Sequence, residues 1–417
     1  MLQEFKPVLN NKNFLYLWTS QITSQLSINI MNFVFLIWLF GKTGSAISTS
    51  FLWVAYSLPA ILVGPFASAM VDLIDRRKIL IITNLLQSLT VLIFALTHQG
   101  NIFLLFEVVF IYSLLNQFYV PAENASVPSL LPKDRLVQGN SLFFLTQQGS
   151  LVLGFGLAGL VLALLGFENT LLVCSFLLFI AFLSTLFLPK LSTGNNVPHN
   201  FELAVTGFFG KIAEGYNFIK GERRVLTPFL LLLIFQVLVQ VATVAVPSIA
   251  KDLLRLSLNT AGIFILVPAG IGAIVGILVL PRLIANGWRK KRVIENCLIL
   301  VGVFLFLFTF VVPMLPYSIR VISTFISFII LGLAFVGVTI PSQTFLQEST
   351  PKELRGRVFG NFWFLVTVAS VLPVIFAGSI IEVLGIRILL LIFSILGISA
   401  YFFSRKFGDN FLNNGTE

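Results

Sequence analysis

Long uninterrupted runs of apolar residues alternate with short polar segments along the whole chain of 417 residues. A helix needs about 20 mostly apolar residues to cross the hydrocarbon core of a bilayer, and many of the runs reach that length. The pattern therefore predicts twelve membrane-spanning helices. They are expected near residues 14–40, 45–71, 79–98, 102–122, 138–165 and 170–189, and then near residues 225–249, 259–284, 293–314, 317–341, 359–383 and 386–404.

The runs favour helices over a membrane barrel. Each helix satisfies its own backbone hydrogen bonds in lipid, whereas barrel strands alternate between apolar and polar positions over about ten residues. No such alternation is present. The predicted fold class is an all-α polytopic membrane protein, and the first apolar run is too long for a cleaved signal peptide, so it is expected to remain in the mature protein.

Composition supports this conclusion. Hydrophobic residues make up 57% of the chain and charged residues only 11%, whereas soluble domains are nearer half apolar and a quarter charged. Cys174 and Cys297 both fall inside predicted spans, which predicts no disulfide framework and no metal site. The two histidines, His98 and His199, are expected to be solvated loop residues.

The net charge of +10 is distributed as a topology signal and does not form a nucleic-acid surface, because the basic residues lie in short clusters between apolar runs. With both termini in the cytoplasm, 22 of the 27 lysines and arginines lie on the cytoplasmic side. The five exceptions are Lys42, Lys251, Arg255, Arg320 and Arg387. Because losing or adding one span would scramble this asymmetry, it supports a multi-pass protein with twelve spans.

The chain divides into two halves around one long polar stretch. We expect an N-terminal six-helix bundle over residues 1–189, a cytoplasmic linker over 190–224, and a C-terminal six-helix bundle with a short tail over 225–417. Within the linker, apolar residues recur at helical intervals between Glu202 and Glu222, which predicts an amphipathic helix on the inner membrane face.

The two halves resemble each other at an offset of about 210–220 residues. Residues 120–140 contain VP, LPKDRL and GN in the same order in which residues 340–361 contain IP, TPKELR and GN. The segments GFGLAGLVLALLG at 154–166 and PVIFAGSIIEVLG at 373–385 also align. Because each half starts inside and has an even number of spans, the halves are predicted to be parallel repeats around one central pathway.

Residues 64–78, with the sequence GPFASAMVDLIDRRK, carry the most specific motif. This segment is similar to the signature between helices two and three of major facilitator superfamily transporters, although Leu73 stands where that family usually has arginine. Together with residues 132–140 and 351–361, it makes the whole chain resemble the bacterial drug-exporter branch, which contains macrolide efflux pumps and the enterobactin exporter. The resemblance implies a secondary transporter that works by alternating access.

The resemblance also implies that the signature loop locks the two halves together on the inside. Asp72 is expected to lie at the N-terminus of a second-half helix, where its charge is worth roughly 0.3–1 kcal/mol. Arg76 and Arg77 are expected to complete the gate by pairing with cytoplasmic acids such as Asp134 or Glu353. The alternative is that these bases only fix the orientation of the protein in the membrane.

Polar residues inside predicted spans mark the candidate pathway. Gln25, Asn29 and Asn32 share one face of the first span, and Gln236, Gln240 and Thr243 recur at the same spacing 211 residues later. Amides in lipid are costly, so this polar stripe is expected to face the interior, with Asn116 as a further candidate. The alternative is that the stripe only joins helices by hydrogen bonds. Uncharged amides, with Trp38, Trp53 and Tyr56 nearby, suit a neutral or weakly charged amphipathic substrate.

Coupling to an ion gradient needs a titratable group, and the coupling ion is expected to be a proton. Glu107, near the outer end of the fourth span, is the first candidate, and Glu382, near the outer end of the eleventh, is the second. Both residues are equally well explained as solvated groups at the headgroup level.

The sequence thus predicts a monomeric antiporter that exports drug-like or siderophore-like amphipathic molecules without any cofactor. No GxxxxGK[ST] loop occurs, which excludes ATP hydrolysis at such a loop. An importer or a lipid flippase of the same fold is the alternative among transporters. An intramembrane enzyme is the alternative from another class, but the chain has no cluster of His, Asp, Glu or Cys to support one.

Overall fold

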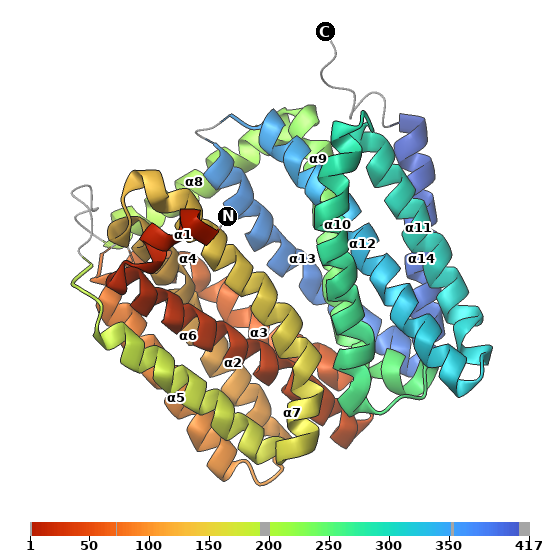
Figure 1. Ribbon diagram of the computed structural model, residues 1–417, viewed down its shortest axis with the longest axis horizontal. Coiled ribbons are helices and arrows are strands. Elements are labelled where there is room, and N and C mark those ends of the chain that lie inside the picture. The colour runs from red at the N-terminus through yellow and green to blue at the C-terminus, as the bar shows by residue number, and fades with distance from the viewer. Residues whose placement is uncertain (1, 72, 192–200, 352–353, 408–417) are drawn as a thin grey trace. The chain divides into compact units, whose positions relative to one another are not determined.

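The computed structural model describes the whole chain except residues 1, 72, 192–200, 352–353 and 408–417 (Figure 1). Every regular element among the described residues is helical. The elements are α1 (Leu2–Leu9), α2 (Lys12–Thr43), α3 (Ala46–Leu62), α4 (Gly64–Val71), α5 (Arg76–Thr97), α6 (Ile102–Leu130), η1 (Lys133–Arg135), α7 (Leu136–Leu186), α8 (Phe201–Gly221), α9 (Arg223–Ser248), η2 (Ile249–Leu253), η3 (Leu258–Thr260), η4 (Gly262–Leu266), α10 (Val267–Ala285), α11 (Lys290–Phe310), η5 (Val312–Met314), α12 (Tyr317–Ser349), α13 (Arg355–Leu384) and α14 (Ile386–Phe407).

The membrane-spanning helices are those that the hydrophobic pattern predicts. Ten helices of the described chain are long and apolar enough to cross a membrane, and the bent pair α3 and α4 supplies an eleventh span. The long helix α7 is broken at Gly166, whose φ of 78° and ψ of 173° are not helical. Counting α7 as two spans brings the total to twelve, which confirms the predicted fold class.

Two spans extend further than predicted. The fourth was expected to end at residue 122, but α6 continues through Pro121 to Leu130, and α12 likewise continues through Pro341 to Ser349. The apolar run ends near each proline, so the hydrophobic pattern predicts loops after Pro121 and Pro341. They remain helical because their polar side chains, such as Glu123 and Ser126, point into the protein rather than into lipid.

The internal repeat is visible in the backbone. Gly166 and Gly385, which occupy equivalent places in the aligned segments, both adopt positive φ angles, of 78° and 85°. A side chain at either position would be strained in this left-handed region, so glycine is required in both halves. Each glycine separates two helices, the halves of α7 in one case and α13 and α14 in the other.

The described chain forms two compact units. The first comprises residues 1–42 and 52–210, and the second comprises residues 43–51 and 211–417, so α3 begins in the second unit and ends in the first. The domain boundaries expected from the sequence, on either side of residues 190–224, stay predictions. Helix α8 occupies the segment where an amphipathic helix is predicted.

Each unit has its own packing. In the first, α5 packs between α6 and α7, and α4 packs on α6. In the second, α12 contacts α9, α10 and α11, while α14 packs on α11 (Figure 1). Buried apolar clusters lie at these contacts, around Phe14 and Leu17 in the first unit and around Phe362 and Ile294 in the second.

Candidate functional site

The amides of α2 do not all have the same surroundings. Asn29 is buried, and its Nδ2 donates a hydrogen bond to the carbonyl oxygen of Gln25, one turn earlier, at 2.8 Å. It packs closely on α7, because a Cβ atom placed on Gly154 would lie only 2.5 Å from the Asn29 Cβ. Asn29 therefore occupies a helix–helix contact, as the alternative interpretation of the stripe proposes for it.

Asn32, one turn further along α2, lines a small cavity. Leu52, Trp53, Tyr56 and Val109 complete its wall, and its volume is about 20 Å³, enough for about one water molecule. All five lining residues belong to the first unit. The cavity thus combines one amide with two aromatic rings and has no charged group in its wall.

Asn116 of α6 lies close to Tyr56 in the wall of this cavity. Ser113, on the preceding turn of α6, donates its hydroxyl to the Tyr56 carbonyl oxygen at 2.5 Å. These contacts connect α3 and α6 around the cavity. The structure therefore brings Asn32 and Asn116 into one locality, two of the residues that the sequence marks as pathway candidates.

The matching stripe lies on α9 in the second unit. Gln236, Gln240 and Thr243 are half-buried, and the Thr243 hydroxyl donates to the carbonyl oxygen of Val239 in its own helix at 2.9 Å. Their intermediate burial resembles that of Gln25 and Asn32. That the two stripes face each other across a pathway stays a prediction.

The two acids expected to carry coupling have other environments. Glu107 is exposed on α6. Glu382 is exposed as well and caps α3: its Oε2 accepts hydrogen bonds from the Ser45 hydroxyl at 2.6 Å and from the Ile47 amide at 3.2 Å. A carboxylate at a helix N-terminus satisfies free N–H groups there, so these contacts give Glu382 a structural function.

The basic residues of the signature loop bind backbone oxygens of their own unit. Arg76 donates to the Ala125 carbonyl oxygen at 2.9 Å, and Arg77 donates to the Leu186 carbonyl oxygen at 2.7 Å, at the end of α7. The expected pairing of these arginines with Asp134 is wrong, because that carboxylate pairs with its neighbour Arg135 at 3.2 Å. Helix C-termini present free carbonyl groups to cations, which explains the preference of Arg77.

The other expected members of the gate, Asp72 and Glu353, lie outside the described residues. Asp75, a neighbour in the same loop, caps α5 through a hydrogen bond from the Arg77 amide at 3.0 Å and also accepts one from the Leu191 amide at 3.2 Å. Asp75 thus links the signature loop both to the start of α5 and to Leu191, the residue that lies shortly after the end of α7. A gating role for Asp72, Arg76 and Arg77 stays a prediction.

Sequence analysis did not identify Glu123 of α6. Its side chain is 3% exposed, and the Tyr119 hydroxyl donates to its Oε1 at 2.6 Å. The Tyr119 oxygen also lies 3.0 Å from the Ser24 hydroxyl and 3.4 Å from the Ser20 hydroxyl, both on α2. Asn84 of α5 donates to Ser20 at 3.1 Å. We call these five residues the Glu123 cluster.

The sequence contained a signal for this cluster. Tyr119 and Glu123 are four residues apart, which places them on one face of a helix if the helix continues past Pro121. The predicted fourth span ends at residue 122, which leaves Glu123 in a loop. A carboxylate in a solvated loop is common and does not by itself indicate a functional site. The polar residues after Pro121 mark the interior face of a longer helix.

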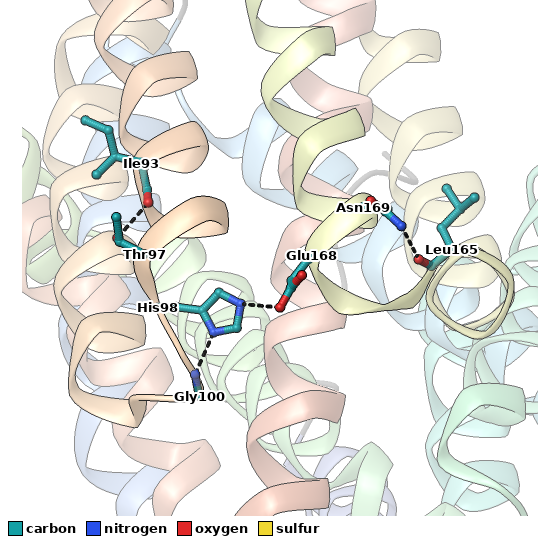
Figure 2. A network of polar contacts seen from close by, with 7 residues as sticks. All are labelled: Ile93, Thr97, His98, Gly100, Leu165, Glu168 and Asn169. Carbon is teal, nitrogen blue, oxygen red and sulfur yellow. Dashed lines mark hydrogen bonds and ion pairs between the residues drawn. The ribbon is translucent and has the colours of Figure 1, made fainter.

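His98 was also misassigned. It was expected to be solvated, but it is 6% exposed, and its ring packs against Trp38, Phe94 and Phe167. Its Nδ1 accepts a hydrogen bond from the Gly100 amide at 2.9 Å, and its Nε2 lies 3.8 Å from Glu168 (Figure 2). The imidazole is covered because His98, at the C-terminal end of α5, lies against aromatic rings from α2, α5 and α7. His199 lies outside the described residues.

The same packing places Trp38 outside the wall of the Asn32 cavity. Its indole stacks on Phe167 at a centroid distance of 4.5 Å, beside His98, whereas Trp53 and Tyr56 lie in the wall of the Asn32 cavity. Of the three aromatic residues expected near the amides, two are there.

Comparison with known protein families shows which family the chain belongs to. The model of the Major Facilitator Superfamily matches residues 17–373, which is most of the chain and extends into both halves. The chain belongs to the major facilitator superfamily. Members of this family are multi-pass membrane transporters, so the protein is an integral membrane protein and a transporter.

Relatives within the superfamily include exporters. The chain is 24% identical over 397 residues to the uncharacterized MFS-type transporter YfiS of Bacillus subtilis (strain 168), covering 93% of this chain and 91% of that protein. It is 27% identical to the multidrug efflux pump Tap of Mycolicibacterium fortuitum, with 87% and 88% covered. Macrolide efflux protein A of Streptococcus pyogenes is 31% identical over 130 residues, which is 30% of this chain and 32% of that protein.

Solved structures of the superfamily confirm the fold. The nucleoside transporter NupG superimposes with a TM-score of 0.73 at 16% sequence identity, covering 94% of this chain and 98% of that one. An identity this low establishes a common fold alone. The resemblance to a major facilitator transporter that the signature loop implies is therefore confirmed.

Proposed function

We propose that the chain is a proton-coupled exporter of small amphipathic compounds, drug-like or siderophore-like, which works by alternating access. In this proposal it is a monomeric antiporter of the bacterial inner membrane with both termini in the cytoplasm. The observation that carries the substrate class is the wall of the Asn32 cavity, an amide beside two aromatic rings with no charged side chain.

The chemistry of this wall selects for weakly charged molecules. Aromatic and apolar surface binds the carbon skeleton of an amphipathic compound, while one or two polar groups such as Asn32 and Asn116 orient it. A phosphorylated or strongly anionic substrate requires an arginine or lysine to hold its charge, and none contributes to the wall. The substrate is therefore neutral or weakly basic.

The size of the cavity implies that substrate binding requires a conformational change. Pockets for drug-sized ligands have volumes of about 300–1,000 Å³, far above the volume of about 20 Å³ found here. In this conformation the cavity is closed to such a substrate. Binding one requires the helices that line the cavity, α2, α3 and α6, to move apart within the first unit.

Relatives support the direction of transport. The similarity to Tap extends over 87% of this chain, and that protein is a multidrug efflux pump. Because no nucleotide-binding loop is present, an ion gradient is the remaining source of energy, and the proton is the ion proposed.

An accumulation assay tests the proposal. Bacteria lacking their own drug exporters are loaded with Hoechst 33342, a weakly basic amphipathic dye, with and without expression of the protein. Expressing cells should retain less dye, and a protonophore should abolish the difference. Greater retention would indicate an importer, a difference that survives the protonophore would refute proton coupling, and movement of fluorescent lipid alone would indicate a flippase.

The role of the cavity is tested by Asn32→Leu, with Asn169→Leu as the matched control. Asn169 makes the same amide-to-alkyl change at an exposed position, where its Nδ2 bonds only to the Leu165 carbonyl oxygen at 2.9 Å (Figure 2). We expect Asn32→Leu to lower the export of polar probes relative to apolar ones at equal protein level, and the control to leave the profile unchanged. Identical profiles for both variants would exclude Asn32 from the pathway.

A further inference from the structure

Glu123 is the one carboxyl group that the described structure buries. Among the buried polar and charged residues of the described chain, no other aspartate or glutamate and no lysine or arginine is present. A buried carboxylate is costly in a low-dielectric interior unless a cation or several hydrogen-bond donors compensate its charge. The surroundings of Glu123 therefore decide which protonation state this conformation favours.

Hydrogen bonds give the carboxyl group little compensation. Tyr119 donates one hydrogen bond to Oε1, and among the described residues this is the only hydrogen bond to the carboxyl group. From Tyr119 the contacts run to Ser24 and Ser20 on α2 and then to Asn84 on α5. All these side chains are at least nine-tenths buried and uncharged.

No cation pairs with Glu123 among the described residues. Arg76 at the start of α5 reaches the same part of α6, but its guanidinium binds the carbonyl oxygen of Ala125 and the hydroxyl of Ser129. Tyr112 and Tyr119 lie on the same face of α6 as Glu123, and both are phenols, which supply no positive charge.

The remaining neighbouring elements add no compensating charge. Helix α4 carries no titratable residue between Gly64 and Val71. Helix α2 contributes hydroxyl groups to the cluster, and its own lysines, Lys12 and Lys42, lie at its two ends. The titratable groups of α7 are Glu168, exposed near the His98 loop, and the buried thiol of Cys174.

We propose that Glu123 is the residue of the first unit that carries the coupled proton. In the conformation described here the carboxyl group holds a proton, because a lone carboxylate is unfavourable in this environment. When the helices separate and water enters the cluster, the acid transfers its proton to water and the carboxylate becomes hydrated. On return, the carboxylate takes a proton from water on the other side. This inference rests on the proposed function, whose coupling ion it assigns to a group.

The internal repeat indicates why only one unit carries this group. The segment around Pro121 aligns with that around Pro341, which places Gln343 in the second half where Glu123 stands in the first. Glutamine has the shape of the protonated acid but never ionises. The second unit therefore has the neutral counterpart, and Glu123→Gln makes the first unit equivalent to it.

Proteoliposomes with an imposed pH gradient test the assignment, with Hoechst 33342 as the probe. We expect Glu123→Gln to lose gradient-driven dye accumulation while it still exchanges dye between internal and external pools, because exchange requires no net proton movement. Glu123→Asp should restore part of the accumulation. Glu107→Gln is the matched control, since it makes the same change on the exposed face of α6, and it should behave as the unmodified protein.

A second measurement does not depend on transport. Infrared difference spectra of the protein in lipid nanodiscs, taken between acidic and alkaline buffer, should contain a carboxylic-acid C=O band. The band should be absent in Glu123→Gln and present in Glu107→Gln. In Tyr119→Phe it should move to higher frequency, because the hydrogen bond to the carboxyl group is lost.

Together, the transport assay and the infrared measurement distinguish failure of the proposed function from failure of the Glu123 assignment. If the unmodified protein moves no dye, the proposed function fails for this probe, and the infrared band alone decides whether Glu123 titrates. If the unmodified protein accumulates dye and Glu123→Gln accumulates it equally well, the assignment to Glu123 is overturned while proton-coupled export stands. A titrating band that is unchanged in Glu123→Gln also overturns it.

Discussion

Two helices of the second unit, α10 and α12, pack backbone to backbone at a pair of glycines. Gly272 of α10 packs on the backbone of Ile329, and Gly332 of α12 packs on the backbone of Ala269. A Cβ atom at Gly332 would lie 2.7 Å from the carbonyl carbon and 2.9 Å from the Cα of Ala269, and closer still to its carbonyl oxygen. The contact is reciprocal, and backbone atoms form it on both sides, so no side-chain rotation relieves a clash.

The substitution Gly332→Ala should therefore be strongly destabilising. Non-bonded carbon atoms are comfortable at about 3.5–4.0 Å, so the helices must separate locally by about 1 Å. Overpacking of this kind costs typically 1–3 kcal/mol, and the upper end applies because both partners are backbone. For a unit of about 200 residues, a loss of about 3 kcal/mol corresponds to a fall of roughly 6–12 °C in the thermal midpoint.

The assay is thermal unfolding of the purified protein in detergent, followed by intrinsic fluorescence. Gly360→Ala in α13 is the matched control, because no atom lies within 4 Å of its added Cβ. Alanine is a better helix former than glycine, so the control should be neutral or stabilised by up to about 1 kcal/mol. Equal midpoints for the two variants would refute the claim that α10 and α12 pack backbone to backbone.

Two further predictions concern polar contacts at helix ends. Glu382→Ala removes the carboxylate that caps α3 through Ser45 and Ile47, which should cost about 0.5–1 kcal/mol and make amide hydrogen exchange at the start of α3 roughly fivefold faster. Unchanged exchange there would show that the cap is not formed in solution. His98→Phe keeps an aromatic ring in its site but removes the acceptor for the Gly100 amide, and it should cost about 1 kcal/mol in thermal unfolding. A variant as stable as the unmodified protein would show that water replaces the lost acceptor.

Much of the architecture was predictable because lipid imposes a strong constraint on sequence. Each span requires about 20 apolar residues, so the twelve runs identify twelve spans, and the structure confirms them. The errors at α6 and α12 have one cause. A hydrophobic run identifies the part of a helix that contacts lipid. Both helices continue past Pro121 and Pro341 into polar segments that contact protein, so the run ends before the helix does.

The candidate site was predictable only in part. Periodicity placed Gln25, Asn29 and Asn32 on one face of α2, but that face is wide enough to meet different neighbours along its length. The packing of Gly154 against Asn29 makes that residue part of a helix contact, while Asn32 reaches the cavity one turn away. Spacing along one helix contains no information about which helix lies opposite.

The sequence by itself determined the membrane-spanning helices, the internal repeat and the family, because each is recognised from the order of residues along the chain without knowing which helices pack together. Only the tertiary structure decided that Glu123 is buried and Glu107 exposed, and that Arg77 binds the end of α7. The physical reason is that burial and partner choice depend on contacts between helices that are distant in sequence. Glu382, Glu107 and Glu123 carry the same carboxyl group. The surrounding helices determine that the first caps a helix, the second is exposed and the third is buried.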